Sequence, residues 1–377
     1  MTAVAVLGAG NGGCAAAADL TLRGFDVRLT TRTRETLAPL MDRGGIELVG
    51  EAGEGFARIA RITPDLREAV EGAEVLLLTV PTTAHGHYAR ALAPLLKPHQ
   101  IVMLNPGHTC GGLHLAAALR RHGITWTVRL CETFTLTYCC RMAGPARVKV
   151  TRVATNLLFA AFPGRQRDEL LAACRALYPN LEPADDVLQT AFLNINATEH
   201  PPQALLNAGW LEHTRGDYLF YYEGTTPAVG RAIDALDAER VAVARALGLR
   251  TMDFYEAFWR AGYTTEAAAG TRSAYRCLQE SAPNRWIKGP QSLDHRYMHE
   301  DVGHGLVPMA EFGRMAGVPT PVMDAFIRVG SVVNGIDYRR EGLTLARMGL
   351  EGIRPAELGR FLYEGPKEPP ALPPTLP

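Results

Sequence analysis

Three glycines near the start of the chain have the spacing and the setting of a dinucleotide-binding turn. Gly8, Gly10 and Gly13 follow the apolar residues 4–7 and precede an alanine-rich stretch at residues 14–22. In such a turn the first glycine permits a sharp exit from a strand, the second lets the backbone approach a pyrophosphate, and the third lets the helix pack closely on the sheet. The free N–H groups of the helix N-terminus then face the phosphates. The pattern predicts cofactor binding, and the alternative is a turn with a structural role alone.

The end of the next predicted strand, residues 25–29, indicates which dinucleotide binds. An NAD site usually ends this strand with Asp or Glu, which accepts a hydrogen bond from a ribose hydroxyl. This chain instead has Thr31, Arg32 and Arg34 there. A guanidinium group pairs with a 2′-phosphate and stacks on adenine, so the sequence favours NADP over NAD. The alternative is that both arginines are solvated surface charges. The other positions expected to line the cofactor, near predicted strand ends, are Asn11, Pro81 and Asn105.

A histidine beside a proline pair indicates acid–base chemistry. Pro201 and Pro202, directly after His200, are expected to break or kink a long helix and so to open space where an imidazole meets a substrate. Unperturbed histidine titrates at about pH 6.5, so it donates and accepts protons near neutral pH. Glu300 or Asp301 is expected to supply a carboxylate that orients the ring. The alternative is that His200 is a hydrogen-bonded interior residue.

A guanidinium group lies in the same segment as those two carboxylates. Arg296 suits a substrate carboxylate, because the guanidinium fork binds both oxygens. The segment also holds residue types that ligate metals, namely His295, His299, Glu300, Asp301 and His304. Its last two histidines are five residues apart, whereas the zinc motif HExxH requires four, so they would not share a helical face. We therefore expect no metal site.

The first half of the chain alternates strand-like with helix-like segments. Apolar runs predict strands at residues 3–8, 26–30, 58–62, 74–80, 101–104, 126–131, 147–151 and 157–162. Helical patterns lie between them at residues 13–23, 34–43, 66–71, 83–95, 111–122 and 166–177. This alternation predicts an α/β fold with a Rossmann-type, doubly wound parallel sheet. Residues 75–80 are continuously apolar, as expected for a strand that is covered on both faces.

Helical patterns alone follow a change of composition near residue 182. They lie at residues 186–208, 224–247, 252–259, 271–280, 308–315, 319–334 and 341–348. The sequence thus predicts a dinucleotide-binding domain at residues 1–182 and an all-α C-terminal domain at residues 183–364. Residues 365–377 contain six prolines and little apolar content, so a disordered tail is expected.

Composition excludes several classes of function. The 39 basic residues balance the 39 acidic ones, so no nucleic-acid partner is indicated. No apolar run approaches the ~20 residues needed to span a bilayer. Met1 leads directly into the first strand with no signal-peptide pattern, so we expect a cytoplasmic protein. The seven cysteines are an odd number without CxxC spacing, which indicates reduced thiols.

Several segments together resemble one known family, the octopine/nopaline (opine) dehydrogenases, over most of residues 1–350. They are the glycine turn, the loop Asn105-Pro106-Gly107, and residues 132–141, 194–209 and 296–301. The resemblance implies a Rossmann domain followed by a helical opine-dehydrogenase domain. It also implies reductive condensation of an amino acid with a pyruvate-like 2-oxo acid, using NAD(P)H. These two small molecules would be the partners, and a homodimer is compatible with the likeness.

The same resemblance implies roles for individual residues. His200 would be the acid/base, Asp301 its orienting partner and Arg296 a carboxylate ligand. Glu132 and Thr135, which follow a predicted strand, are expected to contact the amino-acid part of the substrate or else to cap local structure. The residues Thr31 and Arg32 depart from the acidic pattern of relatives that use NAD.

Two other functions fit the same two-domain plan. The first is a direct carbonyl reductase, such as a hydroxyacid or ketopantoate-type dehydrogenase, which needs no amine. The second is a nucleotide-binding protein without turnover. The sequence leaves open which amino acid and which oxo acid react, as well as the stereochemistry of the product and the oligomeric state.

Overall fold

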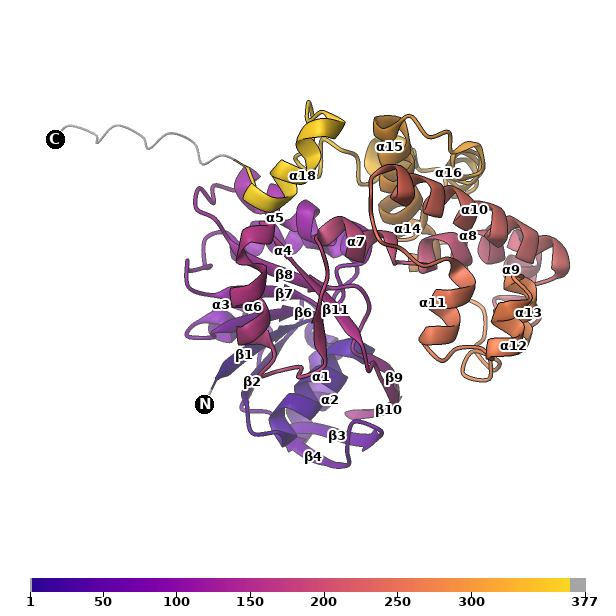
Figure 1. The fold of residues 1–377 in the computed structure, drawn as a ribbon. Helices are drawn as coiled ribbons and strands as arrows, with labels where there is room; N and C mark the ends of the chain where they lie inside the picture. The colour runs from indigo at the N-terminus through magenta and orange to yellow at the C-terminus, as the bar shows by residue number, and fades with distance from the viewer. Residues whose placement is uncertain (1, 367–377) are drawn as a thin grey trace.

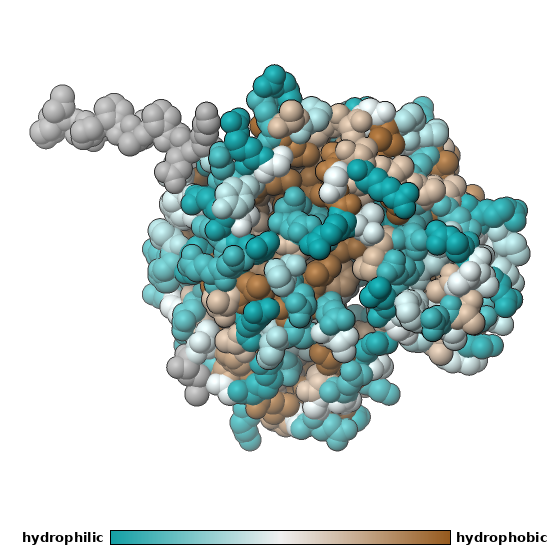
Figure 2. All heavy atoms as spheres, viewed as in Figure 1, coloured by the Kyte–Doolittle hydropathy of each residue, from teal (hydrophilic) through white to brown (hydrophobic). Residues whose placement is uncertain are grey.

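The chain folds into two bodies that lie side by side in a computed structural model, which describes residues 2–366. Figure 1 shows a sheet-containing body in indigo to magenta and a helical body, mostly orange and yellow, next to it. From residue 367 onward, the tail expected at residues 365–377 lies outside the described residues. On the face shown in Figure 2, polar residues are spread over both bodies and do not gather into one stripe.

The main sheet has eight strands in the order β12-β11-β8-β7-β6-β1-β2-β5. Its neighbouring strands run parallel, except that β11 pairs antiparallel with β8. The strands are β1 (Ala3–Leu7), β2 (Asp26–Thr30), β5 (Arg61–Ile62), β6 (Val75–Leu78), β7 (Ile101–Leu104), β8 (Arg129–Thr133), β11 (Leu157–Phe162) and β12 (Leu181–Pro183). The arrangement confirms the predicted Rossmann-type sheet.

Helices cover both faces of this sheet. They are α1 (Asn11–Leu22), α2 (Arg34–Arg43), α3 (Leu66–Val70), α4 (His85–Leu92), α5 (Gly111–Arg121) and α6 (Arg167–Cys174). Alternate residues of β1 enter different cores: Val4 and Val6 pack in one with α1, whereas Ala5 and Leu7 pack in the other with α4 and α5. β6 is buried along its whole length, which explains its continuous apolar pattern.

A second, four-stranded sheet was not predicted. It has the order β4-β3-β10-β9 and packs against α1, with β3 (Gly45–Gly50), β4 (Gly55–Arg58), β9 (Tyr138–Gly144) and β10 (Arg147–Val153). The expected strand at residues 147–151 belongs here and not to the main sheet. The expected strand at residues 58–62 is split, because Arg58 ends β4 in this sheet while β5 joins the main one. The strands of this second sheet are partly exposed, so their sequences carry a weak apolar pattern.

The helical body begins after β12. Its helices are α7 (Val187–Phe192), α8 (Asn196–Leu205), α9 (Ala208–Thr214), α10 (Pro227–Ala246), α11 (Phe254–Arg260), α12 (Glu266–Gly270), α13 (Ala274–Gln279), α14 (Arg296–His299), α15 (Val307–Ala316), α16 (Pro321–Asn334), α17 (Tyr338–Glu341) and α18 (Pro355–Glu364). A π-helical turn, Val302–Leu306, joins α14 to α15. The last helix, α18, returns to the sheet body, where Phe361 lies 5.6 Å from Phe162 between ring centroids.

Two helix predictions were wrong. The helix expected at residues 186–208 is broken at residues 193–195, before the proline pair, and Pro201 and Pro202 lie inside α8. The chain breaks there because Arg240 donates a hydrogen bond to the carbonyl oxygen of Phe192, the last residue of α7. The helix expected at residues 341–348 is absent, because α17 ends at Glu341 and turns follow it.

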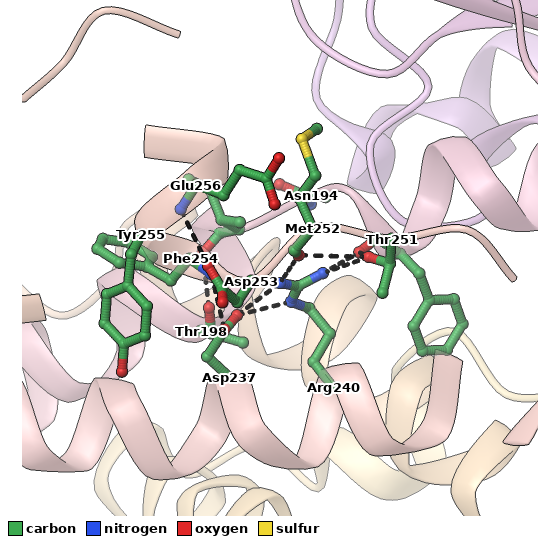
Figure 3. A network of polar contacts seen from close by, with 12 residues as sticks. Asn194, Thr198, Asp237, Arg240, Thr251, Met252, Asp253, Phe254, Tyr255 and Glu256 are labelled. Atoms are coloured by element: carbon green, nitrogen blue, oxygen red, sulfur yellow. Dashed lines mark hydrogen bonds and ion pairs between the residues drawn. The ribbon is translucent and has the colours of Figure 1, made fainter. Parts of the chain in front are cut away.

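A buried arginine joins three segments of the helical body (Figure 3). Arg240 on α10 is fully buried and donates to Asp237 Oδ1 from Nε at 2.8 Å and from Nη2 at 2.6 Å. It also donates to the carbonyl oxygen of Met252 at 2.7 Å. Asp237 Oδ2 accepts the backbone N–H of Phe254 at 2.7 Å, at the start of α11. The network thus ties α10 to the end of α7 and to the beginning of α11.

We predict that Arg240→Met lowers the free energy of unfolding by about 3–5 kcal/mol, because it leaves Asp237 buried without its partner. Denaturant unfolding followed by tryptophan fluorescence measures this loss. The matched control is Arg250→Met, which breaks an exposed ion pair with Asp185 and should cost at most about 1 kcal/mol. Equal, small losses for both variants would contradict the prediction.

Three histidines form a cluster where the two bodies meet. The His114 ring on α5 lies 6.1 Å from the His85 ring on α4, and 5.6 Å from the His304 ring on the π-helical turn, between ring centroids. Burial lowers the pKa of His85 to about 3, of His114 to about 2 and of His304 to about 4. The other ionisable groups that act on the cluster are His108, Arg121, Glu300 and Arg347. All three rings are therefore neutral at pH 7.

We predict that this cluster destabilises the fold in acid. The unfolded chain protonates its histidines near pH 6.5, whereas the folded cluster resists protonation, so its stabilising contribution is complete above that pH and falls below it. The loss is on the order of 1 kcal/mol per histidine for each pH unit. His114→Gln should therefore lose less stability than the wild type between about pH 6.5 and about pH 5, as measured by thermal unfolding.

The comparison between variants is needed because buried carboxyl groups act in the opposite sense. Burial raises the pKa of Glu132 and of Glu199 to about 7, so the folded state binds protons there as the pH falls. The control is His122→Gln, at the exposed histidine that directly follows α5, and its stability should follow that of the wild type at each pH. A His114→Gln variant with the wild-type pH dependence would refute the role of the cluster.

Candidate active site

The glycine turn has the shape that a dinucleotide pyrophosphate needs. Gly8 has a φ of +115°, and a Cβ there would lie 2.7 Å from Val80 Cγ1. A Cβ on Gly13 would lie 1.7 Å from the carbonyl oxygen of Gly8, so only glycine lets α1 approach β1 this closely. Gly10 is exposed, with open space where its Cβ would be, and no side chain caps the N-terminus of α1. The residues present therefore fit a bound pyrophosphate.

The end of β2 carries the residues expected to select the dinucleotide. Arg32 is exposed there, and it acts electrostatically on Tyr88 of α4. Burial and the nearby charge of Arg32 lower the pKa of His87, which lies on α4. The arrangement is a cationic corner with no carboxylate on residues 30–34. Pro81, at the end of the turn after β6, is also exposed.

The side chains of two asparagines expected to contact the cofactor form hydrogen bonds within the protein. The Asn105 side chain donates to Thr137 Oγ1 at 2.8 Å and accepts the backbone N–H of the same residue at 3.0 Å. Asn11 Oδ1 accepts the backbone N–H of Met142, on β9, at 2.9 Å. Together they hold the segment 134–142 over the N-terminus of α1, where Leu136 packs on Gly12.

Glu132, at the end of β8, supports the loop that follows β7. Its Oε2 accepts the backbone N–H of Gly112 at 2.8 Å, and its Oε1 accepts the hydroxyl of Thr190 on α7. Burial raises the pKa of Glu132 to about 7, although these two hydrogen bonds oppose the rise. The carboxylate is fully buried and holds the loop at residues 107–112. Thr135 is partly buried, and its carbonyl oxygen accepts the hydroxyl of Thr133.

His200 and Asp301 form a buried pair. His200 Nδ1 lies 2.7 Å from Asp301 Oδ2, and His200 Nε2 lies 3.0 Å from the hydroxyl of Tyr221. Burial raises the pKa of Tyr221 well above its usual value, so the hydroxyl keeps its proton; it also lies 3.4 Å from the hydroxyl of Tyr297. A carboxylate only accepts hydrogen bonds, so Nδ1 carries a proton and donates to Asp301. Tyr297 stacks on the imidazole, with ring centroids 4.0 Å apart.

Glu300, next to Asp301, connects the two bodies. Its Oε1 accepts the backbone N–H of Thr82 at 2.8 Å, and Thr82 lies in the turn after β6 of the main sheet. Its Oε2 lies 3.1 Å from Arg296 Nε, and its Oε1 lies 3.6 Å from His108 Nε2. Burial alone would raise the pKa of Glu300, but His108, Arg296 and the Thr82 amide outweigh burial and lower it to about 2. Of the two candidate carboxylates, Asp301 contacts His200 and Glu300 joins the bodies.

The tertiary structure adds residues that the sequence did not single out. Tyr221 and Tyr297 contact the imidazole of His200, and Thr82 binds Glu300. His108 acts electrostatically with Glu300, Arg296, Asp301 and His200. His108 lies in the segment 104–109 after β7, where the doubly wound topology places ligand-binding loops. Tyr221 carries no local signal, because it comes from an irregular segment between α9 and α10.

Residues 2–366 contain no group of three or more His, Cys, Asp or Glu side chains that could hold a metal ion. Within the same residues, no helix has both the length and the apolar character to cross a membrane. The site therefore offers an imidazole–carboxylate pair, a half-exposed guanidinium on Arg296 and a dinucleotide cradle, all at the junction of the two bodies.

Comparisons with known proteins agree with this architecture. Residues 183–334 match the alpha-helical domain of the NAD/NADP octopine/nopaline dehydrogenases, and residues 4–126 match the ketopantoate reductase PanE/ApbA family. An opine dehydrogenase of Arthrobacter sp. (strain 1C) is 36% identical over 352 residues, 93% of this chain and 96% of that protein. The vitopine synthase of Allorhizobium ampelinum is 30% identical over 94% of this chain and 97% of its own length.

A solved structure of octopine dehydrogenase with NADH and L-arginine shares the fold. Its TM-score is 0.75 at 20% identity, and the match covers 97% of this chain and 99% of that one. A yersinopine dehydrogenase structure with NADP⁺ bound has a TM-score of 0.68 at 16% identity, over 97% of this chain and 98% of that one. The sequence relatives cover nearly the whole chain, and the helical domain matches the family model. The protein therefore belongs to the octopine/nopaline dehydrogenase family of NAD(P)-dependent oxidoreductases.

Proposed function

We propose that the protein condenses an amino acid with a pyruvate-like 2-oxo acid and reduces the product to an N-(carboxyalkyl) amino acid. The observation that carries this proposal is the buried His200–Asp301 pair at the junction between the dinucleotide cradle and the helical body. Opine dehydrogenase relatives over almost the full chain support the same reaction. The bound reduced dinucleotide would supply the hydride.

His200 is the proton donor and acceptor in this proposal. Asp301 accepts a hydrogen bond from Nδ1, which keeps the ring proton on that nitrogen. The carboxylate also stabilises the charged ring when His200 gains a second proton. Nε2 then faces the reacting carbonyl oxygen, on the side where the Tyr221 hydroxyl lies. Arg296, about half exposed at 45%, binds a substrate carboxylate while Glu300 orients its guanidinium.

The remaining residues position the reactants. Gly8, Gly10, Gly13 and the first turn of α1 would hold the pyrophosphate, and Thr31 and Arg32 would bind a 2′-phosphate, which favours NADP over NAD. Pro81, Asn11 and Asn105 would shape the walls of this site. Thr135 would contact the amino acid, and Glu132 would act through the loop at residues 107–112 that it holds. We propose a division into a dinucleotide-binding domain at residues 1–182 and a helical domain at residues 183–364.

The compartment follows from the same chemistry. The seven cysteines are unpaired, and a nicotinamide-dependent reduction fits a reducing cytoplasm, where we place the protein.

A ketopantoate-type carbonyl reductase is the second candidate, because residues 4–126 match that family. Such an enzyme would reduce the oxo acid directly, without an amine. The match covers the dinucleotide-binding half, whereas the helical half that contains His200 and Asp301 matches the octopine/nopaline dehydrogenases.

Amine-dependent turnover tests the proposed function. Enzyme, NADPH and pyruvate should show a loss of absorbance by NADPH only when a mixture of the twenty amino acids is added. A screen of single amino acids then identifies the substrate. In this assay His200→Gln should lower kcat by about 10²–10⁴-fold while NADPH still binds, because proton transfer is removed without disturbing the cradle. Oxidation of NADPH by pyruvate alone would favour the carbonyl reductase, and an active His200→Gln would refute the assigned role.

Arg32 should determine the preference for the dinucleotide. We predict that Arg32→Asp weakens NADPH binding by at least about tenfold and improves NADH binding, because a carboxylate repels the 2′-phosphate and accepts a bond from the free 2′-hydroxyl. Titration calorimetry with each dinucleotide measures both constants. Arg58→Asp, at an exposed arginine that ends β4, is the matched control and should leave both unchanged. A wild-type protein that prefers NADH would overturn the assignment.

A further inference from the structure

Glu199, the residue before His200, is a buried carboxyl group that the roles above leave unused. It is 3% exposed, and its Oε1 has no hydrogen-bond partner among the described residues. An ionised carboxylate in such a place is costly unless a cation or hydrogen-bond donors satisfy it. Its neighbour in sequence is the proposed acid–base residue, so its position bears directly on the reaction.

The helix α8 presents Glu199 on the same face as His200. Residues 196, 199, 200 and 203 share one side of a helix with 3.6 residues per turn. On this face His200 contacts Tyr221, and Gln203 donates to Thr225 at 2.8 Å, so the face looks toward the segment 218–225. Asn196, one turn earlier on that face, is partly exposed. The helix face that carries Glu199 therefore extends from the buried His200 to the partly exposed Asn196.

Within the part of the chain that the structure describes, no fixed positive charge is among the ionisable groups that act on Glu199. His200 and Asp301 act on it electrostatically, and it acts in turn on Tyr221 and Tyr263. Tyr263, between α11 and α12, is acted on electrostatically by Cys139 of β9 and by Arg152 of β10. Glu199 thus lies near a second contact between the bodies, where β9 and β10 meet the helical body.

Burial raises the pKa of Glu199 to about 7, and the influence of Asp301 adds to the rise while His200 opposes it. In the free enzyme near neutral pH, this carboxyl group is therefore protonated in a large fraction of the molecules. It ionises readily once a cation is brought against it. A group in this state suits an exchange of protons with a substrate ammonium at neutral pH.

We propose that Glu199 receives the α-ammonium group of the amino-acid substrate and takes its proton, so that the neutral amine attacks the carbonyl carbon of the oxo acid. The proposal rests on the proposed function and deepens it by assigning the base. An amino acid enters with its nitrogen protonated and without a lone pair, so condensation requires a base. At this step His200 must already be protonated to act as the acid, so the same imidazole cannot also accept the ammonium proton.

The protons balance over the whole reaction. One ammonium proton passes to Glu199, and the freed lone pair forms the C–N bond while the C=O electron pair moves to oxygen. The oxygen leaves as water with two protons, one from His200 and one from the amine nitrogen, and the C–O bond breaks. After the hydride reaches carbon, Glu199 returns its proton to the secondary amine. His200 regains one proton from solvent, which is the proton that the net reaction consumes.

The test is Glu199→Gln, which keeps the shape of the side chain and removes the base. At about pH 7 we expect kcat/KM for the amino acid to fall about 100-fold. At about pH 10 solvent itself deprotonates the amine, so the deficit should shrink to a few-fold. Glu212→Gln on α9, at an exposed residue, is the matched control and should behave as the wild type at both pH values.

A binding measurement supplies a second readout. Calorimetry in buffers of different ionisation enthalpy should show that wild-type protein, already bound to NADP⁺, releases about half a proton when the amino acid binds at pH 7. The Glu199→Gln protein should release none, and its unchanged affinity for NADPH would show that it folds.

The outcomes separate the two proposals. Wild-type activity at pH 7 in Glu199→Gln, or an equal deficit at both pH values, would overturn the assignment of the base and leave the proposed function standing. A wild-type enzyme without amine-dependent turnover would instead overturn the proposed function.

Discussion

One hydrogen bond between the two bodies determines where the site lies. Glu300, at the end of α14, accepts the backbone N–H of Thr82 from the turn after β6. A buried carboxylate needs such donors to stay ionised, because burial alone favours its protonated form. Asp301 is the next residue, so this bond also fixes the carboxylate that holds His200. The acid–base pair therefore faces the strand ends of the sheet body, where a dinucleotide binds in folds of this type.

A second buried charge, on Arg240, sets the direction of the helix that carries His200. Arg240 donates a hydrogen bond to the carbonyl oxygen of Phe192, the last residue of α7. The chain therefore changes direction at residues 193–195, and α8 begins on a new axis. The helical body thus uses a few buried charges to set directions that apolar packing alone would leave free. The cost is sensitivity to pH, because the interface also buries the neutral ring of His85 and of its two neighbours.

Much of the plan could be read from sequence because it depends on local periodicity. The strands β1, β6 and β7 are apolar runs, and α1 follows a glycine turn whose spacing reports a close helix–sheet contact. The small sheet escaped prediction because its strands have one exposed face and pair across long stretches of chain, as β3 does with β10. The helix break predicted at the proline pair was wrong for a related reason. The break at residues 193–195 depends on Arg240, which is forty-eight residues away from Phe192 in the chain.

The sequence by itself determined the fold class, the glycine cradle, the cationic end of β2 and the residue types gathered around His200 and Asp301. Each of these follows from neighbours along the chain, where side-chain type and spacing act directly. Only the tertiary structure decided that Asp301 and not Glu300 contacts the imidazole, and that Tyr221 and Tyr297 pack around it. It also decided that Glu199 is buried with no hydrogen-bond partner for its Oε1 among residues 2–366. Such contacts join residues far apart in the chain, and burial, which controls their charge, exists only once the two bodies have packed together.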